Sequence, residues 1–421
     1  MLDLKWIREN SDKVREGLKA KNVTLDLDGL LRLDQERRGY LHEADQLKAK
    51  RNQVNDEIAR LKKSGQPADQ VIASMKEVSQ KIKDLDDKVG DVSQKIAGFE
   101  LMIPNVPHES VPIARGAEGN KIVRTWGEPR KFNFKPANHL ELGAERNALF
   151  SMAWGAKLTG SGFPVYRGLG ARLERALINF MIDLHVSKHK FTEVWPPALV
   201  NRASMTGTGQ LPKMEEDMYR LKEEDFFLIP TAEVPVTNIH RDDVLQEKDL
   251  PVYYTAYSPC FRREAGSYGK DTQGLMRVHQ FDKIEMVKFV KPESSMDELE
   301  SLTGCAEAVL QALELPYRVV LLGSGDMSFA AAKCYDLEVW APGTEKWFEV
   351  SSCSTFGDFQ ARRANIRFRR EATNKLEFVH TLNGSGVALA RTVLCIIENF
   401  QTAEGKIEFP KALKPYLEPP K

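Results

Sequence analysis

A heptad pattern of apolar residues dominates the N-terminal quarter of the chain. Apolar or aliphatic-stemmed side chains alternate at spacings of three and four from Leu30 to Leu61, and again from Ile72 to Phe99. The turn-forming run Ser64-Gly65-Gln66-Pro67 separates the two halves. Such a narrow seam predicts an antiparallel two-helix coiled-coil hairpin over residues 28–99, with arms about 45 Å long. A hairpin of this kind cannot form a globular core, so we expect it to project into solvent.

The hairpin carries charges of both signs. Basic side chains gather on the first arm and at the tip, and acidic ones on the return arm. Charge alone leaves two interpretations open: a solvated face without a ligand, or a probe for a nucleic-acid phosphate backbone. The residues concerned are Lys48, Lys50, Arg51, Arg60, Lys62 and Lys63 against Asp84, Asp86, Asp87 and Asp91.

Bulk composition narrows the class of protein but not its partner. The 421 residues include 60 Lys and Arg against 60 Asp and Glu, so any basic surface must be local. Five scattered cysteines, without CxxC pairs or zinc-finger spacing, favour a reducing compartment over a disulfide framework. The charged N-terminus has no long apolar run. We therefore expect a cytoplasmic protein with no signal peptide and no membrane partner.

The sequence divides into three regions. Residues 1–103 form an N-terminal domain, in which a short helical unit with Asp3 as a cap precedes the hairpin. The heptads stop at Pro104, and residues 104–136 form a linker that includes a first strand at 121–126. Residues 137–421 mix helices, expected at 139–158 and 171–187, with several strands that follow one another directly. This order indicates an α+β fold with an antiparallel or mixed sheet flanked by helices.

No common nucleotide-binding or hydrolytic motif is present, neither GxxxxGK(S/T) nor GxGxxG after a strand. Three arginines, Arg262, Arg277 and Arg391, are candidate forks for phosphate oxygens. Phe281 offers a stacking face for a nucleotide base. Glu349 and Ser352 form a pair of hard oxygen donors suited to magnesium.

A small polar pocket is the second candidate site. Its carboxylates would attract an ammonium group and a hydroxyl, and its members are Thr231, Glu233, Glu285, Asn383 and Ser385. We expect Glu349–Ser352 to end a strand, and 383–386 to open the helix that carries Arg391. Each residue also has a purely structural alternative: Arg262 and Glu264 as a cross-strand ion pair, Ser385 as a helix N-cap.

In combination these segments resemble class II aminoacyl-tRNA synthetases, and specifically the bacterial seryl-tRNA synthetase family. Phe261-Arg262-Arg263-Glu264 resembles motif 2, and Phe191 to Pro197 behind a helix resembles motif 1. Residues 384–391 resemble motif 3. Thr231-Ala232-Glu233 is similar to the serine-binding signature of the family, and residues 349–363 and the hairpin are also typical of it. The resemblance covers essentially the whole chain.

The resemblance implies an ATP-dependent serine–tRNA ligase with a class II antiparallel sheet, Mg²⁺ as cofactor and a homodimer built through motif 1. Its partners would be L-serine and tRNA(Ser), with tRNA(Sec) as a possible second acceptor. Catalysis would rest on Arg262, Glu264 and Arg391. Serine would lie among Thr231, Ala232, Glu233, Arg262, Glu285, Asn383 and Ser385, with Glu285 on its hydroxyl. ATP would contact Arg262, Arg263, Glu264, Val278, Phe281, Glu349, Val350, Ser351, Ser352 and Arg391, and the metal would bind Glu349 and Ser352.

One difference from the family and two rival interpretations accompany this resemblance. Lys270 and Gln273 stand in the motif 2 loop where relatives often carry arginine.

A ligase that charges a carrier protein would share the catalytic domain, but the long hairpin argues against it. A non-catalytic paralogue is disfavoured because the charged set at positions 262, 264, 285, 349 and 391 is intact.

Overall fold

The computed structural model describes residues 1–264 and 273–418, which divide into two compact units. The smaller unit comprises Leu2–Lys19 and Val23–Ile103. The larger unit runs from Pro104 onward and includes Met1 and Ala20–Asn22.

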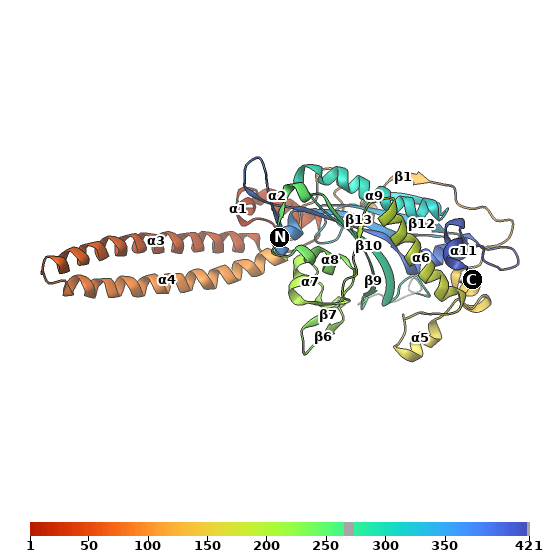
Figure 1. Cartoon of the computed structure of the whole chain (residues 1–421), viewed down its shortest axis with the longest axis horizontal. Helices are drawn as coiled ribbons and strands as arrows, with labels where there is room; N and C mark the ends of the chain where they lie inside the picture. Colours follow the sequence, from red (N-terminus) through yellow and green to blue (C-terminus); the bar gives the residue numbers. More distant parts are fainter. Residues whose placement is uncertain (265–272, 419–421) are drawn as a thin grey trace. The chain divides into compact units, whose positions relative to one another are not determined.

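The smaller unit is built on two long helices, which confirms the predicted coiled-coil hairpin. α3 (Leu27–Lys63) and α4 (Asp69–Met102) run antiparallel and side by side (Figure 1). The turn between them uses Gly65 at φ 72°, a conformation that glycine adopts without strain. Ile72, placed in the seam by its spacing, is exposed, and half-buried Val71 faces inward instead. The seam buries Leu30, Ala44, Met75, Ile82, Leu85, Val92 and Ile96.

A buried carboxylate holds the base of the hairpin. The short helices α1 (Leu4–Glu9) and α2 (Ser11–Ala20) precede α3, and the Asp3 side chain caps α1 by accepting from the Trp6 N–H. Asp34 of α3 is fully buried and accepts from Arg8 Nη1 at 2.8 Å and from Arg38 Nε at 3.1 Å. Because Arg8 belongs to α1, this ion pair ties the first helix to the coiled coil.

The larger unit is organised around an eight-stranded sheet with the order β1-β11-β12-β13-β16-β10-β9-β4. Every neighbouring pair is antiparallel except β4 with β9 at one edge, so the α+β prediction is confirmed. The strands are β1 (Lys121–Trp126), β4 (Thr192–Glu193), β9 (Val252–Phe261), β10 (Gln280–Val290), β11 (Tyr317–Leu321), β12 (Lys333–Ala341), β13 (Lys346–Gly357) and β16 (His380–Ala388).

One face of this sheet is covered by three helices and forms the main core. They are α6 (Leu169–Ser187), α9 (Ser295–Ala312) and α11 (Leu389–Asn399), seen against the sheet in Figure 1. Side chains alternate between the two faces of a strand. In β10, Ile284 and Met286 therefore enter this core, while Val287 and Phe289 pack on the opposite face.

Smaller elements cover part of the opposite face and the sheet edges. Three small sheets pair β2 with β3, β5 with β7 and β6, and β15 with β14 and β8. The remaining helices and strands are α5 (Met152–Leu158), α7 (Arg202–Thr208), α8 (Glu233–Thr237), α10 (Phe359–Ala364), α12 (Lys414–Leu417), β2 (Phe150–Ser151), β3 (Val165–Tyr166), β5 (Leu199–Asn201), β6 (Arg220–Leu221), β7 (Phe226–Leu228), β8 (Val244–Gln246), β14 (Arg367–Arg369) and β15 (Leu376–Phe378). Within the described ranges, no helix combines the length and the apolar character needed to cross a membrane.

Three local predictions were wrong. The single helix expected at 139–158 is broken into a π-helical turn (Leu140–Arg146), β2 and α5, because Ala148 adopts φ 52° and the chain reverses there. Asn383 and Ser385 do not open a helix or cap one, since β16 continues to Ala388 and α11 starts at Leu389. Nor does a strand end at Glu349–Ser352, because β13 runs on to Gly357 between two hydrogen-bonded neighbours.

The Asp34 ion pairs give a stability prediction. We expect Asp34→Asn to weaken the docking of α1 by about 1.5–3 kcal/mol, the usual worth of hydrogen bonds to a charged group. Hydrogen–deuterium exchange of the full chain should then show faster exchange in α1 and at the start of α3. Asp28→Asn is the matched control, because Asp28 pairs with Arg15 at an exposed position and its loss should change little. Equal exchange in both variants would contradict the assignment.

Candidate active site

A cavity of about 790 Å³ opens on the face of the sheet opposite α6, α9 and α11. Its walls come from β10, β13 and β16, and from the segments that precede β7 and follow β9. Phe281 and Lys283 reach it from β10, and Asn383 and Ser385 from β16. Side chains two residues apart in a strand point to the same face of the sheet. These four side chains therefore lie on the sheet face opposite the main core.

A buried ion pair lies at the floor of the cavity. Glu285 is fully buried, and its Oε2 contacts Lys283 Nζ in a short ion pair and accepts from Thr231 Oγ1 at 2.9 Å. Lys283 Nζ also donates to Thr231 Oγ1 at 2.9 Å. Each of the three side chains is therefore partnered, which offsets the cost of burying the ion pair.

A second carboxylate, Glu233, is held beside the first. Gln360 Nε2 donates to its Oε1 at 2.6 Å, and Asn383 Nδ2 donates to its Oε2 at 3.1 Å. The same Asn383 amide donates to Glu285 Oε1 at 3.0 Å and so links the two carboxylates. Burial, and next the nearby charge of Glu285, raises the pKa of Glu233 to about 7. The floor thus offers negative charge that a bound cation would stabilise.

The motif 2 side of the cavity presents an arginine and an aromatic ring. Arg262 follows β9, and its guanidinium lies 5.2 Å from the centre of the Phe281 ring. Arg277 Nε contacts Glu264 Oε2 at 3.1 Å, so the structure shows an ion pair between these two residues. Arg262 is exposed at the mouth of the cavity, and its Nε donates to the Pro230 oxygen at 3.4 Å.

The opposite end of the cavity is formed by Arg391 and Glu349. Arg391 Nη1 donates to the Glu349 backbone oxygen at 2.8 Å and to its carboxylate at 3.2 Å, and Nε donates to the Met276 oxygen at 3.1 Å. Arg391 reaches this position because it lies in the first turn of α11, directly after β16. Contacts with β13 and with the segment before β10 therefore hold the guanidinium at a defined place.

A third carboxylate, Asp336, lies close to Glu349. Burial, and next the negative charge of Glu349, raises the pKa of Asp336 well above its usual range. Ser352 pairs with Asp336 across β12 and β13, and its hydroxyl lies 3.1 Å from Cys334 Sγ. Among the described residues no three His, Cys, Asp or Glu side chains form a metal cluster, so a cation here would need further oxygen ligands from a substrate.

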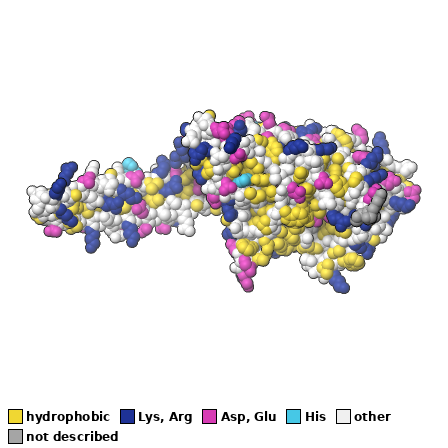
Figure 2. All heavy atoms as spheres, viewed as in Figure 1, with side chains coloured by type: hydrophobic (Ala, Val, Ile, Leu, Met, Phe, Trp, Pro, Cys, Tyr) yellow, Lys and Arg dark blue, Asp and Glu magenta, His cyan; other side chains and the backbone are white. Residues whose placement is uncertain are grey.

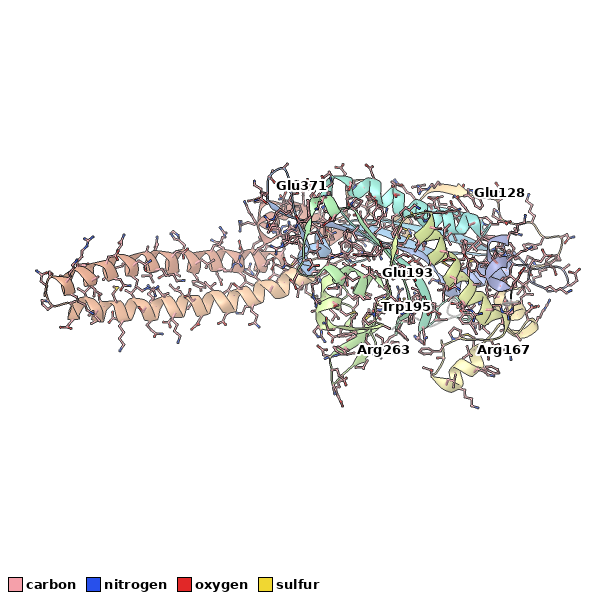
Figure 3. All side chains as sticks on the ribbon, viewed as in Figure 1. Glu128, Arg167, Glu193, Trp195, Arg263 and Glu371 are labelled. Carbon is pink, nitrogen blue, oxygen red and sulfur yellow. The ribbon has the colours of Figure 1, made fainter. Side chains whose placement is uncertain are left out.

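The structure brings most of the predicted site residues to this one cavity. Ala232 and Ser351 are buried outside its lining, and the Ser351 hydroxyl donates to the Ser385 oxygen at 2.6 Å. Arg263, labelled in Figure 3, is exposed and also lies outside it. Glu285 lies just beneath the lining. Lys270 falls outside the described residues, and Gln273 is exposed. The predicted residues that do line the cavity are Thr231, Glu233, Arg262, Glu264, Arg277, Val278, Phe281, Glu349, Val350, Ser352, Asn383, Ser385 and Arg391.

Sequence reasoning missed three residues of the site, Lys283, Gln360 and Asp336. Lys283 was detectable in principle, because it lies midway between Phe281 and Glu285 at the spacing of one strand face. Gln360 and Asp336 gave no such signal. Gln360 reaches the site through its hydrogen bond to Glu233, 127 residues away in the chain, and Asp336 through the pairing of β12 with β13.

Comparison with known proteins identifies two family domains in the chain. Residues 1–107 match the family model described as seryl-tRNA synthetase N-terminal domain, and residues 215–400 match tRNA synthetase class II core domain (G, H, P, S and T). The chain is 55% identical over 417 residues to the serine–tRNA ligase of Carboxydothermus hydrogenoformans, covering 99% of this chain and 98% of that protein.

Two solved structures are similar along nearly the whole chain. The seryl-tRNA synthetase of Pyrococcus horikoshii, crystallised with ATP, aligns with a TM-score of 0.93 at 38% identity and covers 99% of this chain and 98% of its own. The cytoplasmic serine–tRNA ligase of Naegleria fowleri, in complex with AMP, aligns with a TM-score of 0.88 at 30% identity and covers 99% and 97%. With identity, coverage and motif order in agreement, the chain belongs to the seryl-tRNA synthetases of class II.

Proposed function

We propose that this protein activates serine with ATP to seryl-adenylate and pyrophosphate, and then transfers serine to the 3′ end of tRNA(Ser). One observation carries the proposal: a buried floor of two linked carboxylates lies in the same cavity as two arginines and an aromatic ring. The floor suits a small ammonium with a hydroxyl, and the arginines suit phosphate oxygens. Relatives named serine–tRNA ligase, and a neighbour crystallised with ATP, support it.

Serine recognition would use the floor of the cavity. Glu233 would hold the ammonium, since its charge is the one that a bound cation would stabilise most. Among the described residues, Glu285 Oε1 accepts only from Asn383, which leaves a lone pair for the serine hydroxyl. Alanine would leave these polar groups unpaired and would be rejected strongly, whereas threonine would be excluded by lack of room. Thr231, Ala232, Arg262 and Ser385 would complete the enclosure.

ATP would lie along the wall between the two arginines. Arg262 and Glu264 would hold the α-phosphate and the adenine side, Phe281 would stack on adenine, and Arg391 would hold the γ-phosphate end. Arg263, Val278, Val350 and Ser351 would border the nucleotide. The serine carboxylate would attack the α-phosphorus in line with the leaving pyrophosphate, without a covalent enzyme intermediate. Fixed cations that meet the developing charge would lower the barrier by positioning and electrostatics.

Magnesium fits the same wall. Glu349 and Ser352 supply hard oxygen donors, and the mutual repulsion of Glu349 and Asp336 is the kind that a divalent cation relieves. We assign the metal to Glu349 and Ser352, with the remaining ligands from phosphate oxygens. When bound, Mg²⁺ would neutralise charge on the phosphates. Arg391 holds the Glu349 carboxylate in place for that role.

Motif 1 would form the interface of a homodimer. Trp195 is 77% exposed and lies beside the sheet edge formed by β4 (Figure 3). Leu169 at the start of α6 and Leu199 in β5 are also exposed. Figure 2 shows hydrophobic side chains gathered on one face of this unit. Large contiguous apolar surfaces of this kind mark protein contacts.

The proposal also includes a second tRNA acceptor and a location of the protein in the cell. Acceptance of tRNA(Sec) rests on the family resemblance alone. A cytoplasmic location is supported by the cysteines, because Cys260, Cys305, Cys334, Cys353 and Cys395 are all buried and free.

Pyrophosphate exchange tests the activation step directly. We expect serine-dependent exchange of labelled pyrophosphate into ATP, with alanine at least about 100-fold less effective because it lacks the hydroxyl. Threonine should support little exchange. A protein that binds ATP but shows no serine-dependent exchange would contradict the proposal.

The pH dependence of serine binding tests the role of Glu233. Its pKa in the free protein is raised to about 7, whereas a bound ammonium would favour the ionised carboxylate. Serine binding below that pH must therefore release a proton, and the affinity should rise about tenfold per pH unit below neutrality and level off above it. Calorimetry in buffers of different ionisation enthalpy measures the released proton. In Glu233→Gln the slope should disappear, and a wild-type affinity independent of pH would refute the role.

The hairpin is proposed to read the tRNA. Its arms are joined by ion pairs such as Lys48 with Asp86 at 2.9 Å, and both signs of charge are mixed along it (Figure 2). Replacing residues 33–96 with a short Gly-Ser turn should keep pyrophosphate exchange within about twofold and abolish tRNA charging, because only the second step needs contacts with the phosphate backbone of the tRNA. Reversal of charge at Arg60, Lys62 and Lys63 in the full chain is the matched variant and should lower charging alone. Normal charging by the shortened protein would exclude the hairpin as the tRNA reader.

A further inference from the structure

A short segment, Gly274–Arg277, is held at three points where the chain returns from the motif 2 loop. The Leu275 N–H donates to His139 Nε2 at 3.3 Å, the Met276 oxygen accepts from Arg391 Nε at 3.1 Å, and Arg277 pairs with Glu264. Gly274 adopts φ 64°, and a Cβ there would lie 2.4 Å from His139 Nε2. The backbone of this segment is therefore fitted closely against His139.

His139 is itself fixed by a buried carboxylate. Its side chain is 2% exposed, and its Nδ1 lies 3.0 Å from Glu398 Oε1, which also accepts from the His139 backbone N–H at 2.9 Å. Because Nε2 accepts a hydrogen bond from Leu275, the ring proton belongs on Nδ1, where it can be donated to Glu398. The ring thus bridges Leu275 and Glu398, with one nitrogen facing each of them.

Glu398 does not move freely either. Its Oε2 accepts from the backbone N–H groups of Gly343 at 2.9 Å and of Thr344 at 2.8 Å, and its Oε1 accepts from the Thr344 hydroxyl at 2.6 Å. Glu398 and Arg391 lie seven residues apart in α11, which places them on one face of the helix. One helix therefore holds the same returning segment twice, directly through Arg391 and indirectly through His139.

We infer that His139 is a positioning residue for the ATP end of the active site. By holding Leu275, it fixes the carbonyl of Met276 on which Arg391 rests and the approach of Val278 to the cavity. The inference rests on the proposed function, because it assigns the Arg391 wall to ATP. The serine floor contains none of these contacts, so loss of the His139 bridge should weaken the handling of ATP and leave serine binding unchanged.

Two substitutions separate the two hydrogen bonds of the ring. In His139→Asn the amide nitrogen can take the place of Nδ1 and keep the bond to Glu398, but the side chain is too short to reach Leu275. In His139→Gln the amide oxygen can take the place of Nε2 and restore the acceptor for Leu275. We expect His139→Asn to raise the KM for ATP or lower kcat in pyrophosphate exchange about tenfold, with the KM for serine within twofold. His139→Gln should recover most of the loss.

Amide hydrogen exchange in the full-length variants gives a readout independent of activity. Peptides that contain Leu275 should exchange about tenfold faster in His139→Asn than in the wild type or in His139→Gln. His108→Asn is the matched control, since His108 is half-buried and, among the described residues, its ring bonds only to Ser110, two residues away. A second variant, Gly274→Ala, disturbs the contact between Leu275 and His139 from the Leu275 side. It should show the same effect, and it keeps the test possible if His139→Asn folds poorly.

The outcomes distinguish this inference from the proposed function. If no variant or wild-type protein shows serine-dependent exchange, the function fails, while the hydrogen-exchange pattern still tests the bridge. Equal exchange at Leu275 in His139→Asn and in the wild type would overturn the inference. A rise in the KM for serine matching that for ATP would also overturn it, because a general loss of structure would then explain both.

Discussion

The pairing of Glu285 with Lys283 is the interaction on which the rest of the active site depends. A fully buried carboxylate in the central strand of a sheet would be costly without a counter-charge and without hydrogen-bond donors. Lys283 supplies the charge from the same strand face, and Thr231 and Asn383 supply the donors. Because these two donors come from other segments, a fully hydrogen-bonded Glu285 requires β10, β16 and the turn after β7 to assemble together.

The same pairing sets the electrostatics of the cavity. Glu233 lies beside Glu285, and burial, followed by the nearby charge of Glu285, raises the pKa of Glu233 to about 7. Charge in the cavity is then separated by position: carboxylates lie at the floor, and Arg262 and Arg391 lie along the wall. A zwitterionic amino acid and a polyphosphate would be sorted to different ends of one cavity by this arrangement. The wall is stiffened from outside, because Arg391 rests on a segment that His139 and Glu398 hold.

Local patterns predicted the larger elements well and the junctions poorly. The heptads of α3 and α4 were sufficient for the hairpin, because burial of a regular stripe decides such elements. The direct succession of strands was sufficient for the α+β class. The helix expected at 139–158 failed because its interruption depends on a left-handed residue, Ala148, that no local propensity indicates. Asn383–Gly386 read as the start of a helix, but strand pairing on both sides overrides the glycines.

The sequence by itself determined the coiled-coil hairpin, the α+β class, the chain order of the motifs and the identity of most polar side chains in the cavity. These follow from periodicity and from residue type, which are properties of the chain alone. Only the tertiary structure decided that Glu264 pairs with Arg277, that Gln360 and Asp336 join the site, and that Ser351 turns away from it. The reason is physical: strand register and pairing between distant segments choose the neighbours of a buried charge, and a register is set only when the whole sheet assembles.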